Sequence, residues 1–307
     1  MVRHVIRRLA ELIVVLWATS LVVFLIMNAL PGDPASAVLV GQGATPEQLQ
    51  DLRVQLGLDR PMPERYWMFL TDLFHGDLGF SFLTNQSVSS LIMNRLPSTL
   101  QLTVATLIAG TLIGMAVGGY AALSRGSRVA KALSGVLFVW GTVPYFWLGQ
   151  LLILVFAVQL TWLPAVGQGS VTTLILPAAA QAGLIALAVA RLFRSSVEQV
   201  YAEDYVVAAQ SRGYSPARIM MRHVLRNALV PLLTLEALLF GALLTGAVAI
   251  EMLFGRNGLG ADLATAISSK DIPVVQGIVL VIAFVYVMAN LIVDILMPVV
   301  DPRLRAR

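Results

Sequence analysis

The sequence predicts an all-α integral membrane protein with six transmembrane helices. Of its 307 residues, 58% are hydrophobic and only 12% are charged, whereas a soluble domain carries about 25% charged residues. The hydrophobic residues gather in long runs, and none of these runs shows the alternation of a β-barrel strand. The basic residues lie in the gaps between alternate runs. These observations exclude a water-soluble globular domain.

Six apolar runs reach the length of about 20 residues that a helix needs to cross the hydrocarbon core of a bilayer. The third run contains Pro144, which predicts a tilt or a kink in that span. The runs are residues 9–30, 100–123, 132–160, 171–193, 228–250 and 274–298.

Basic residues indicate which ends of these runs face the cytoplasm. Fifteen of the 21 Lys and Arg residues fall on one side of the six spans, which the positive-inside rule makes cytoplasmic. Both termini then lie in the cytoplasm, and Glu11 is expected to pair with Arg7 or Arg8. The fifteen are Arg3, Arg7, Arg8, Arg125, Arg128, Lys131, Arg191, Arg194, Arg212, Arg218, Arg222, Arg226, Arg303, Arg305 and Arg307.

The N-terminus also resembles a signal peptide, with Ala35-Ser36-Ala37 as a small-residue cleavage site. The apolar run of about 22 residues is longer than the 7–15 residues of a typical signal sequence. We therefore predict an uncleaved anchor.

Three regions follow along the chain. Residues 1–30 are the N-terminus and first span, and residues 31–99 form an extracytoplasmic helical segment. Residues 100–307 form the core, with spans two to six, a cytoplasmic loop at 194–227 and a tail at 299–307.

The extracytoplasmic segment carries signals for two helices. Thr45 to Gln48 reads as a capping box with Pro at the first helical position, and Gly57 is suited to end that helix. A second helix is expected after Pro63. Its many aromatic residues suit the membrane interface or local packing better than a partner surface.

Several kinds of chemistry are excluded by composition. The chain has no cysteine, and its three histidines lie far apart in the sequence, so no metal site or disulfide is predicted. Neither Lys131 nor Lys270 stands in a G-x-x-x-x-G-K-[ST] motif, so the chain has no P-loop for ATP. Energy for any transport comes from a partner ATPase or from an ion gradient.

The Arg-rich stretch between spans four and five must lie outside the bilayer. Five Arg residues in lipid would cost about 12–18 kcal/mol. We predict a helix from Val197 to Arg212, ended by Gly213 in the left-handed conformation. Ser215 and Pro216 are suited to begin a second helix, on which Arg218, Arg222 and Arg226 form one basic stripe.

Three interpretations of this loop stand beside one another. It is a solvated basic face that sets topology, a DNA-binding helix-turn-helix, or a docking element for a cytoplasmic partner. DNA binding is disfavoured because the unit is short and tethered to the membrane at both ends. Docking is favoured by the small residues Ala208, Ala209 and Gly213, which we place on one side of the helix, where a partner can approach closely.

The stretch VAAQSRG, followed by His223 and Pro231, resembles the EAA loop of ABC importer permeases. Val207 stands where the general motif has Glu. Further strings in the same order resemble the peptide and nickel branch, and specifically the first permease subunit of dipeptide and oligopeptide importers. These are PGDP (31–34), LGLDRP (56–61), RYWMFL (65–70), GDLGFS (76–81), LPSTLQL (96–102), DYVVAAQSRG (204–213), HVLRNALVP (223–231), EMLFGRNGLG (251–260), KDIPVVQG (270–277) and DPRLR (301–305).

The resemblance implies a translocation subunit in the inner membrane of a bacterium, not an enzyme. ATP and Mg would be bound by two ATPase subunits, which move the spans through a coupling helix in the loop. A second homologous permease would complete the pore, an extracytoplasmic binding protein would deliver a di- or oligopeptide, and nucleic acid has no part. The alternative function is a proton-coupled secondary transporter that uses Glu236, or a scaffold that transports nothing.

Site residues follow from both lines of reasoning. Glu236 lies inside span five, where a carboxylate either lines the substrate path or bonds to a neighbouring helix. Glu251 and Arg256 are further path residues, in a glycine-rich loop. Gly110, Gly114 and Gly118 predict close helix packing, within this chain or against the second permease. The resemblance assigns ATPase coupling to Asp204, Tyr205, Val207, Ala208, Ala209, Gly213, Arg218, Arg222 and His223.

Overall fold

The computed structural model describes residues 2–29, 46–55, 57, 59–81, 83–124 and 126–300. These residues are helical apart from turns and one two-stranded antiparallel ribbon, β1 (Phe80–Ser81) with β2 (Gln86–Ser87). Four sequence predictions lie outside the described residues: the PGDP string, the cleavage site at residues 35–37, the cap at Thr45 and the tail beyond residue 300.

Five helices in the described part are long and apolar enough to cross a membrane. They are α1 (Val2–Ala29), α5 (Val88–Leu123), α8 (Thr172–Tyr201), α11 (Leu225–Leu253) with the turns before it, and α13 (Ile272–Val300). This confirms the helical membrane fold.

The third predicted span is broken at Pro144. α6 (Arg128–Thr142) and the segment made of α7 (Tyr145–Leu152) and η1 (Ile153–Gln159) are bent by 103°. Val143 has the extended backbone that a residue before proline prefers, and Pro144 is the N-cap of α7. The predicted kink is confirmed. The described residues therefore contain five candidate spans, or six if the bent pair crosses the membrane as one.

The chain divides into two compact units, each with its own hydrophobic core. One holds residues 100–256 and 288–307, and the other holds residues 2–99 and 257–287.

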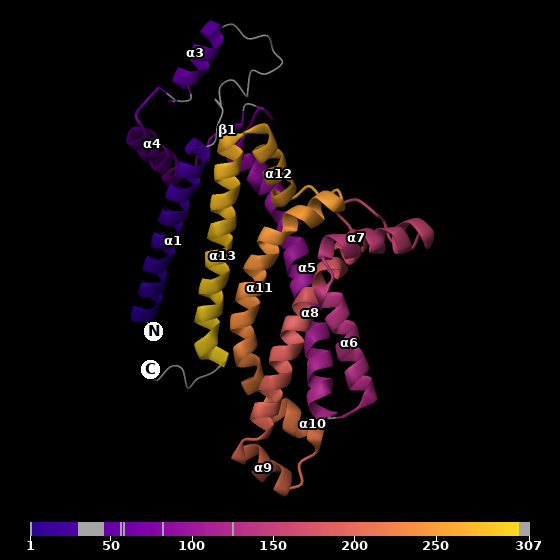
Figure 1. Cartoon of the computed structure of the whole chain (residues 1–307). Helices are drawn as coiled ribbons and strands as arrows, with labels where there is room; N and C mark the ends of the chain where they lie inside the picture. The colour runs from indigo at the N-terminus through magenta and orange to yellow at the C-terminus, as the bar shows by residue number, and fades with distance from the viewer. Residues whose placement is uncertain are drawn as a thin grey trace. The chain divides into compact units, whose positions relative to one another are not determined.

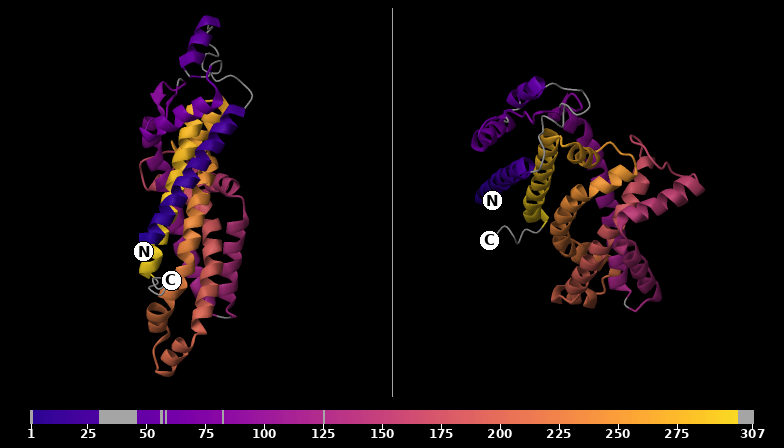
Figure 2. Two further views of the ribbon diagram at one scale, coloured as in Figure 1. Left: turned by 90° about the vertical axis from the view of Figure 1, so that its left-hand side faces the viewer. Right: turned by 45° about the horizontal axis from the view of Figure 1, so that its top comes forward.

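Within the first unit, α5, α6 and α8 run beside one another (Figures 1 and 2). The three glycines of α5 lie against α8. A Cβ at Gly114 would meet the carbonyl oxygen of Ala186 at 2.7 Å, and one at Gly118 would meet that of Ala190 at 2.5 Å. A Cβ at Gly110 would lie 2.5 Å from the Cβ of Ile185. The glycine row therefore packs within this chain, a choice that the sequence left open.

The second unit contains α1, α3 (Pro46–Gln55), α4 (Met62–Phe74), α12 (Leu259–Ser269) and the beginnings of α5 and α13. Gly57 follows α3 with φ +63°, as predicted. The second predicted helix is present as α4, but it begins at Met62, one residue before Pro63 and not after it. Glu11 accepts hydrogen bonds from both Arg7 and Arg8 at 2.9 Å, which confirms that pairing.

Candidate functional site

The Arg-rich loop is built from two short helices at one end of the first unit. α8 ends at Tyr201, and α9 runs from Asp204 to Ser211. The single helix predicted from Val197 to Arg212 is therefore wrong. Glu203 has an extended backbone, with φ −73° and ψ 141°, which turns the chain between the two helices. Figure 1 shows α9 set across the end of α8.

The turn after α9 has the predicted chemistry. Gly213 has φ +77° and donates its N–H to the carbonyl of Gln210, while the N–H of Tyr214 bonds to the carbonyl of Ala209. This pair of bonds is the Schellman arrangement that closes a helix on a left-handed residue. Gly213 has φ in a region that favours glycine, so its backbone fixes where α9 ends.

The second helix begins as the sequence predicts. The hydroxyl of Ser215 accepts the N–H of Arg218 at 3.4 Å and so caps α10 (Pro216–Ile219). α10 continues through the π-helical turns of η2 (Met220–Val224) into α11, and the helix from Ala217 to Leu253 is continuous. The second half of the loop and the membrane helix α11 are therefore one continuous helix.

α9 has one buried and one exposed side. Val206 and Ala209 are buried in a cluster with Ile219 and Val224. Placing Ala209 beside Ala208 on a partner-facing side is therefore wrong, because adjacent helical residues lie about 100° apart around the axis. The exposed surface of the loop carries Asp204, Tyr205, Val207, Ala208, Gly213, Arg218 and Arg222.

Aromatic side chains brace the loop. The Tyr205 hydroxyl accepts a 2.7 Å hydrogen bond from Nδ2 of Asn227 and donates to the carbonyl of His223 at 3.4 Å. The Tyr214 ring stacks on the His223 ring at 6.1 Å, with 14° between the planes. On Tyr214 the Arg218 guanidinium lies 5.6 Å from the ring centroid, a cation–π contact. His223 therefore makes its contacts within the loop. Neither Tyr214 nor Asn227 was predicted as a site residue, because no local pattern marks them.

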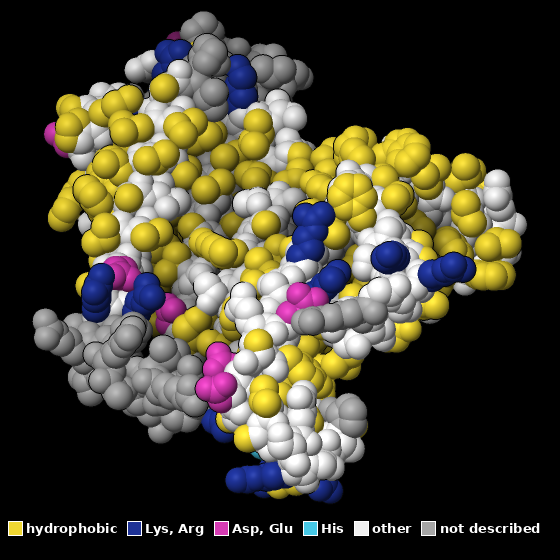
Figure 3. Space-filling view, turned by 60° about the horizontal axis from the view of Figure 1, so that its bottom comes forward, with side chains coloured by type: hydrophobic (Ala, Val, Ile, Leu, Met, Phe, Trp, Pro, Cys, Tyr) yellow, Lys and Arg dark blue, Asp and Glu magenta, His cyan; other side chains and the backbone are white. Residues whose placement is uncertain are grey.

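The basic stripe is exposed at all three of its positions, Arg218, Arg222 and Arg226. Figure 3 shows the molecule with this end turned forward: Lys and Arg side chains are spread over the visible face, with a few Asp and Glu among them, and hydrophobic side chains cover much of the rest. The loop combines exposed apolar side chains of α9 with positive charge, which suits an acidic protein partner.

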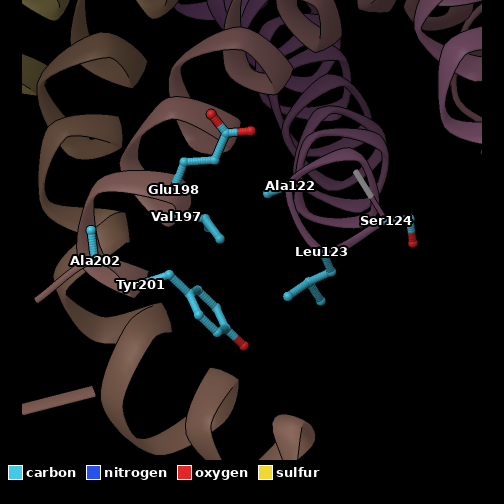
Figure 4. Close-up of a pocket in the computed structure, with 7 residues that line it drawn as sticks. All are labelled: Ala122, Leu123, Ser124, Val197, Glu198, Tyr201 and Ala202. Carbon is cyan, nitrogen blue, oxygen red and sulfur yellow. The ribbon is translucent and has the colours of Figure 1, made fainter. Parts of the chain in front are cut away.

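A pocket of about 490 Å³ lies beside the loop, between the ends of α5 and α8. Figure 4 shows Leu123 and Tyr201 turned toward one another across it. Glu198 on its rim pairs with Arg194 at 3.0 Å. The α5–α8 contact, so close at the glycines, therefore opens at the end that carries α9.

Of the three predicted path residues, the structure brings only Glu251 and Arg256 together. Thr111 on α5 donates a 2.6 Å hydrogen bond to Oε1 of Glu236 on α11, which is the interhelical bond weighed as the alternative. Glu251 and Arg256 are 0% and 2% exposed and lie near one another, with the N–H of Arg256 bonded to the Glu251 carbonyl at 2.8 Å. Burial lowers the pKa of the Arg256 guanidinium, and the charge of Glu251 opposes that shift.

In the second unit, distant strings of the sequence meet in three polar contacts that were not predicted. Ser81 of GDLGFS donates a buried hydrogen bond to Asp271 of KDIPVVQG at 2.5 Å. Arg95 pairs with Asp262 at 3.0 Å. The hydroxyl of Thr99 accepts the N–H of Leu259 at 2.9 Å.

Burial shifts the pKa of both carboxyls in these contacts. Burial raises the pKa of Asp271, while the Ser81 bond and the N–H of Val274 lower it. The pKa of Asp262 is likewise raised by burial and lowered by Arg95. No group of three His, Cys, Asp or Glu side chains suited to a metal occurs in the described part of the chain.

The sequence matches two family models. The first, described as binding-protein-dependent transport system inner membrane component, covers residues 110–306, and its N-terminal counterpart covers residues 1–103. A putative peptide transport system permease protein of Brucella abortus is 38% identical over 309 residues, with 98% of each chain aligned. The glutathione transport system permease protein GsiC of Escherichia coli O6:H1 is 38% identical over 306 residues, with 99% of each chain aligned.

A solved structure has a similar fold. It is the inward-facing MetNI methionine ABC transporter, with a TM-score of 0.55 and 18% sequence identity, covering 69% of this chain and 96% of that one. At this level of identity the likeness concerns the fold alone.

Proposed function

We propose that this chain, which belongs to the family of binding-protein-dependent transport system inner membrane components, carries short peptides across the membrane. Membership makes it the permease part of an ABC importer, which works with ATPase subunits and a binding protein and is not itself an enzyme. It is a multi-pass protein of the inner membrane. Membership of this family also favours an ABC importer permease over a proton-coupled transporter.

The exposed side of α9 is the observation that carries the coupling proposal. We assign this side of α9 as the docking site of a partner ATPase, and that ATPase would bind ATP and Mg. Tyr205, Val207 and Ala208 offer an apolar patch, and the Arg residues of α10 and η2 lie beside it. Because α10 leads without a break into α11, movement of the seated ATPase would rotate or shift a membrane helix.

Peptide cargo is supported by the names of the relatives, which transport peptides or glutathione. We further propose a second homologous permease as the other half of the pore. Both termini and the α9 loop would lie in the cytoplasm, on the side where the basic residues gather.

Glu236 is the proposed contact for a peptide's amino group. Its Oε1 is held by Thr111, while Oε2 has no hydrogen-bond partner among the described residues. A Glu236→Gln variant keeps an acceptor for Thr111 and loses the charge. We expect it to reduce uptake of a free dipeptide and to leave uptake of its N-acetylated form unchanged. Equal uptake of the free dipeptide by the variant and the wild type would limit Glu236 to a structural role.

The first test is a mild-detergent extraction of the tagged chain from its native membrane, followed by mass spectrometry. We expect a second multi-span permease and one or two P-loop ATPases to accompany it. Recovery of the chain alone, in a preparation that still transports, would overturn the assembly.

The coupling surface is tested by Ala208→Glu in the reconstituted assembly. A carboxylate on this exposed face is expected to abolish stimulation of the ATPase by binding protein and peptide, while the chain stays folded. Ala202→Glu is the matched control, because Ala202 is exposed and lies outside α9. Normal stimulation in Ala208→Glu would place the ATPase elsewhere.

A further inference from the structure

α4 has an inner face that packs on α1 within the second unit. The ring of Tyr66 lies 5.2 Å from that of Phe24, and Phe69 stacks on the same ring at 6.0 Å. The hydroxyls of Tyr66 and Ser20 are hydrogen bonded at 2.9 Å. Arg65 lies over Phe24 at 6.0 Å. These contacts account for only part of the apolar surface of α4.

A second apolar stripe points away from α1. Pro63, Trp67, Leu70 and Phe74 recur at i, i+4, i+7 and i+11, the spacing of one helix face. Trp67 is 68% exposed and Phe74 is 87% exposed. We call these four residues the outer stripe.

The neighbouring side of α4 is polar. Glu64, Asp72 and His75 are exposed along it. α4 therefore shows three sides: one against α1, one apolar and open, and one polar and open. The open apolar side would be unfavourable on a helix surrounded only by water. A row of large exposed apolar residues indicates contact with a partner or with lipid.

The contact with α1 fixes the depth of α4. Ser20 and Phe24 both lie inside the apolar stretch Ala10–Ala29 of α1. Phe24 is five residues from Ala29, so it lies roughly 7–8 Å below the end of that stretch at 1.5 Å per residue. Helices that rest in the membrane interface bury their apolar face about 5–10 Å below the headgroups.

The flank of α1 near this contact is itself exposed and apolar, at Val22, Leu25 and Ile26. In a membrane helix such a flank faces acyl chains. Trp67 on the outer stripe has the amphipathic ring that is enriched at the membrane interface.

We propose that α4 is a membrane-surface helix whose outer stripe is inserted among phospholipid acyl chains. Its polar side faces the headgroups and water. α4 thereby anchors the segment between the first two membrane helices at a fixed depth. In the orientation of the proposed function this is the outer leaflet, but the depth itself does not depend on that orientation.

The chain lacks cysteine, so single cysteines can be introduced for nitroxide labels without other changes. We would label Trp67→Cys and Phe74→Cys on the outer stripe, and Glu64→Cys and Asp72→Cys on the polar side as matched controls. The full chain is reconstituted in phosphatidylcholine and phosphatidylglycerol vesicles. Collisions of each label with oxygen, which enters lipid, and with a water-soluble nickel chelate are then measured.

We expect the labels at 67 and 74 to gain oxygen collisions and lose nickel collisions relative to those at 64 and 72. Equal nickel access at all four positions would mean that the stripe faces water, and the proposal would fail. Low access of both reagents to the labels at 67 and 74 would mean that protein covers the outer stripe. That result would also overturn the proposed contact with lipid.

A second measurement needs no label. Brominated phospholipids quench tryptophan fluorescence on contact, so the chain should lose more emission in them than the Trp67→Phe variant does. If the emission difference between the two proteins is the same in brominated and ordinary phospholipid, Trp67 does not touch acyl chains. Neither result depends on whether the chain transports peptides.

Discussion

The α5–α8 contact and the α9–α10 loop lie in one unit but are held in different ways. Along α5 and α8 the contact is made by backbone: glycines meet carbonyl oxygens so closely that a Cβ has no room. The loop is held by side chains, through a small buried cluster and the contacts of Tyr205, Tyr214 and His223.

The difference teaches which part of the molecule acts as a rigid body. Close backbone packing hinders the sliding of α5 along α8. The two helices are therefore expected to move together. The loop depends on few contacts, each worth little, and it exposes most of its surface. Such a segment keeps its local shape yet can adjust to a partner that seats on it.

The largest expected effect comes from Gly114→Leu. Overpacking of a well-packed core costs about 1–3 kcal/mol and occasionally more, and here the obstacle is the backbone of Ala186. We expect loss of folded protein or a strongly lowered melting temperature in detergent. Gly135→Leu is the control, because nothing lies within 4 Å of a Cβ at that glycine. Equal stability of the two variants would refute the rigid contact.

The next effect separates the two alanines of α9. Ala209→Glu buries a charge without a partner, which costs on the order of 3 kcal/mol, whereas Ala208→Glu places the same charge in water. Thermal unfolding and protease cleavage in the loop measure this difference. A stable Ala209→Glu variant would show that the buried cluster does not hold α9.

A smaller effect is expected for Tyr205→Phe. Removing the hydroxyl breaks the bond from Asn227, and a neutral hydrogen bond contributes about 0.5–1.5 kcal/mol. Hydrogen exchange at the amides of α9 should become faster while global stability hardly changes. Tyr120→Phe on α5 serves as the control. Unchanged hydrogen exchange in α9 would show that the hydroxyl of Tyr205 does not stabilise the loop.

The smallest effect concerns a third kind of attachment, the buried Ser81–Asp271 hydrogen bond of the second unit. Because burial raises the pKa of Asp271, the folded state holds this proton more tightly than the unfolded state does. Stability therefore falls as pH rises from the ordinary aspartate value of 3.8 through the raised one. Asp271→Asn keeps an acceptor for Ser81 and should weaken that fall, as followed by unfolding at a series of pH values. A pH profile identical to that of the wild type would contradict the attribution of this pH dependence to Asp271.

Local rules explain why much of the fold was predictable. The spans follow from hydrophobic length, the 103° bend from Pro144, and the ends of the loop helices from Gly213 and Ser215. Each depends on residues within one or two turns, so neighbouring letters in the sequence are sufficient. The break at Glu203 was missed because a helix-compatible sequence gives no signal for a turn that packing imposes.

The site was predictable only in part. The sequence placed the α9 loop outside the membrane and identified its small residues, yet it could not decide that Ala209 faces inward. That depends on Ile219 and Val224, which reach it only after the chain has turned back.

By itself, the sequence determined the class of the protein, its apolar helices and the local chemistry of its turns, because hydrophobicity and backbone preference act over short distances. Tertiary structure alone decided that the glycines of α5 meet α8, that Thr111 bonds Glu236 and that Ser81 reaches Asp271, 190 positions away. Such contacts are set by how whole helices pack, and many pairings of apolar helices bury similar area. Only the assembled chain selects among them.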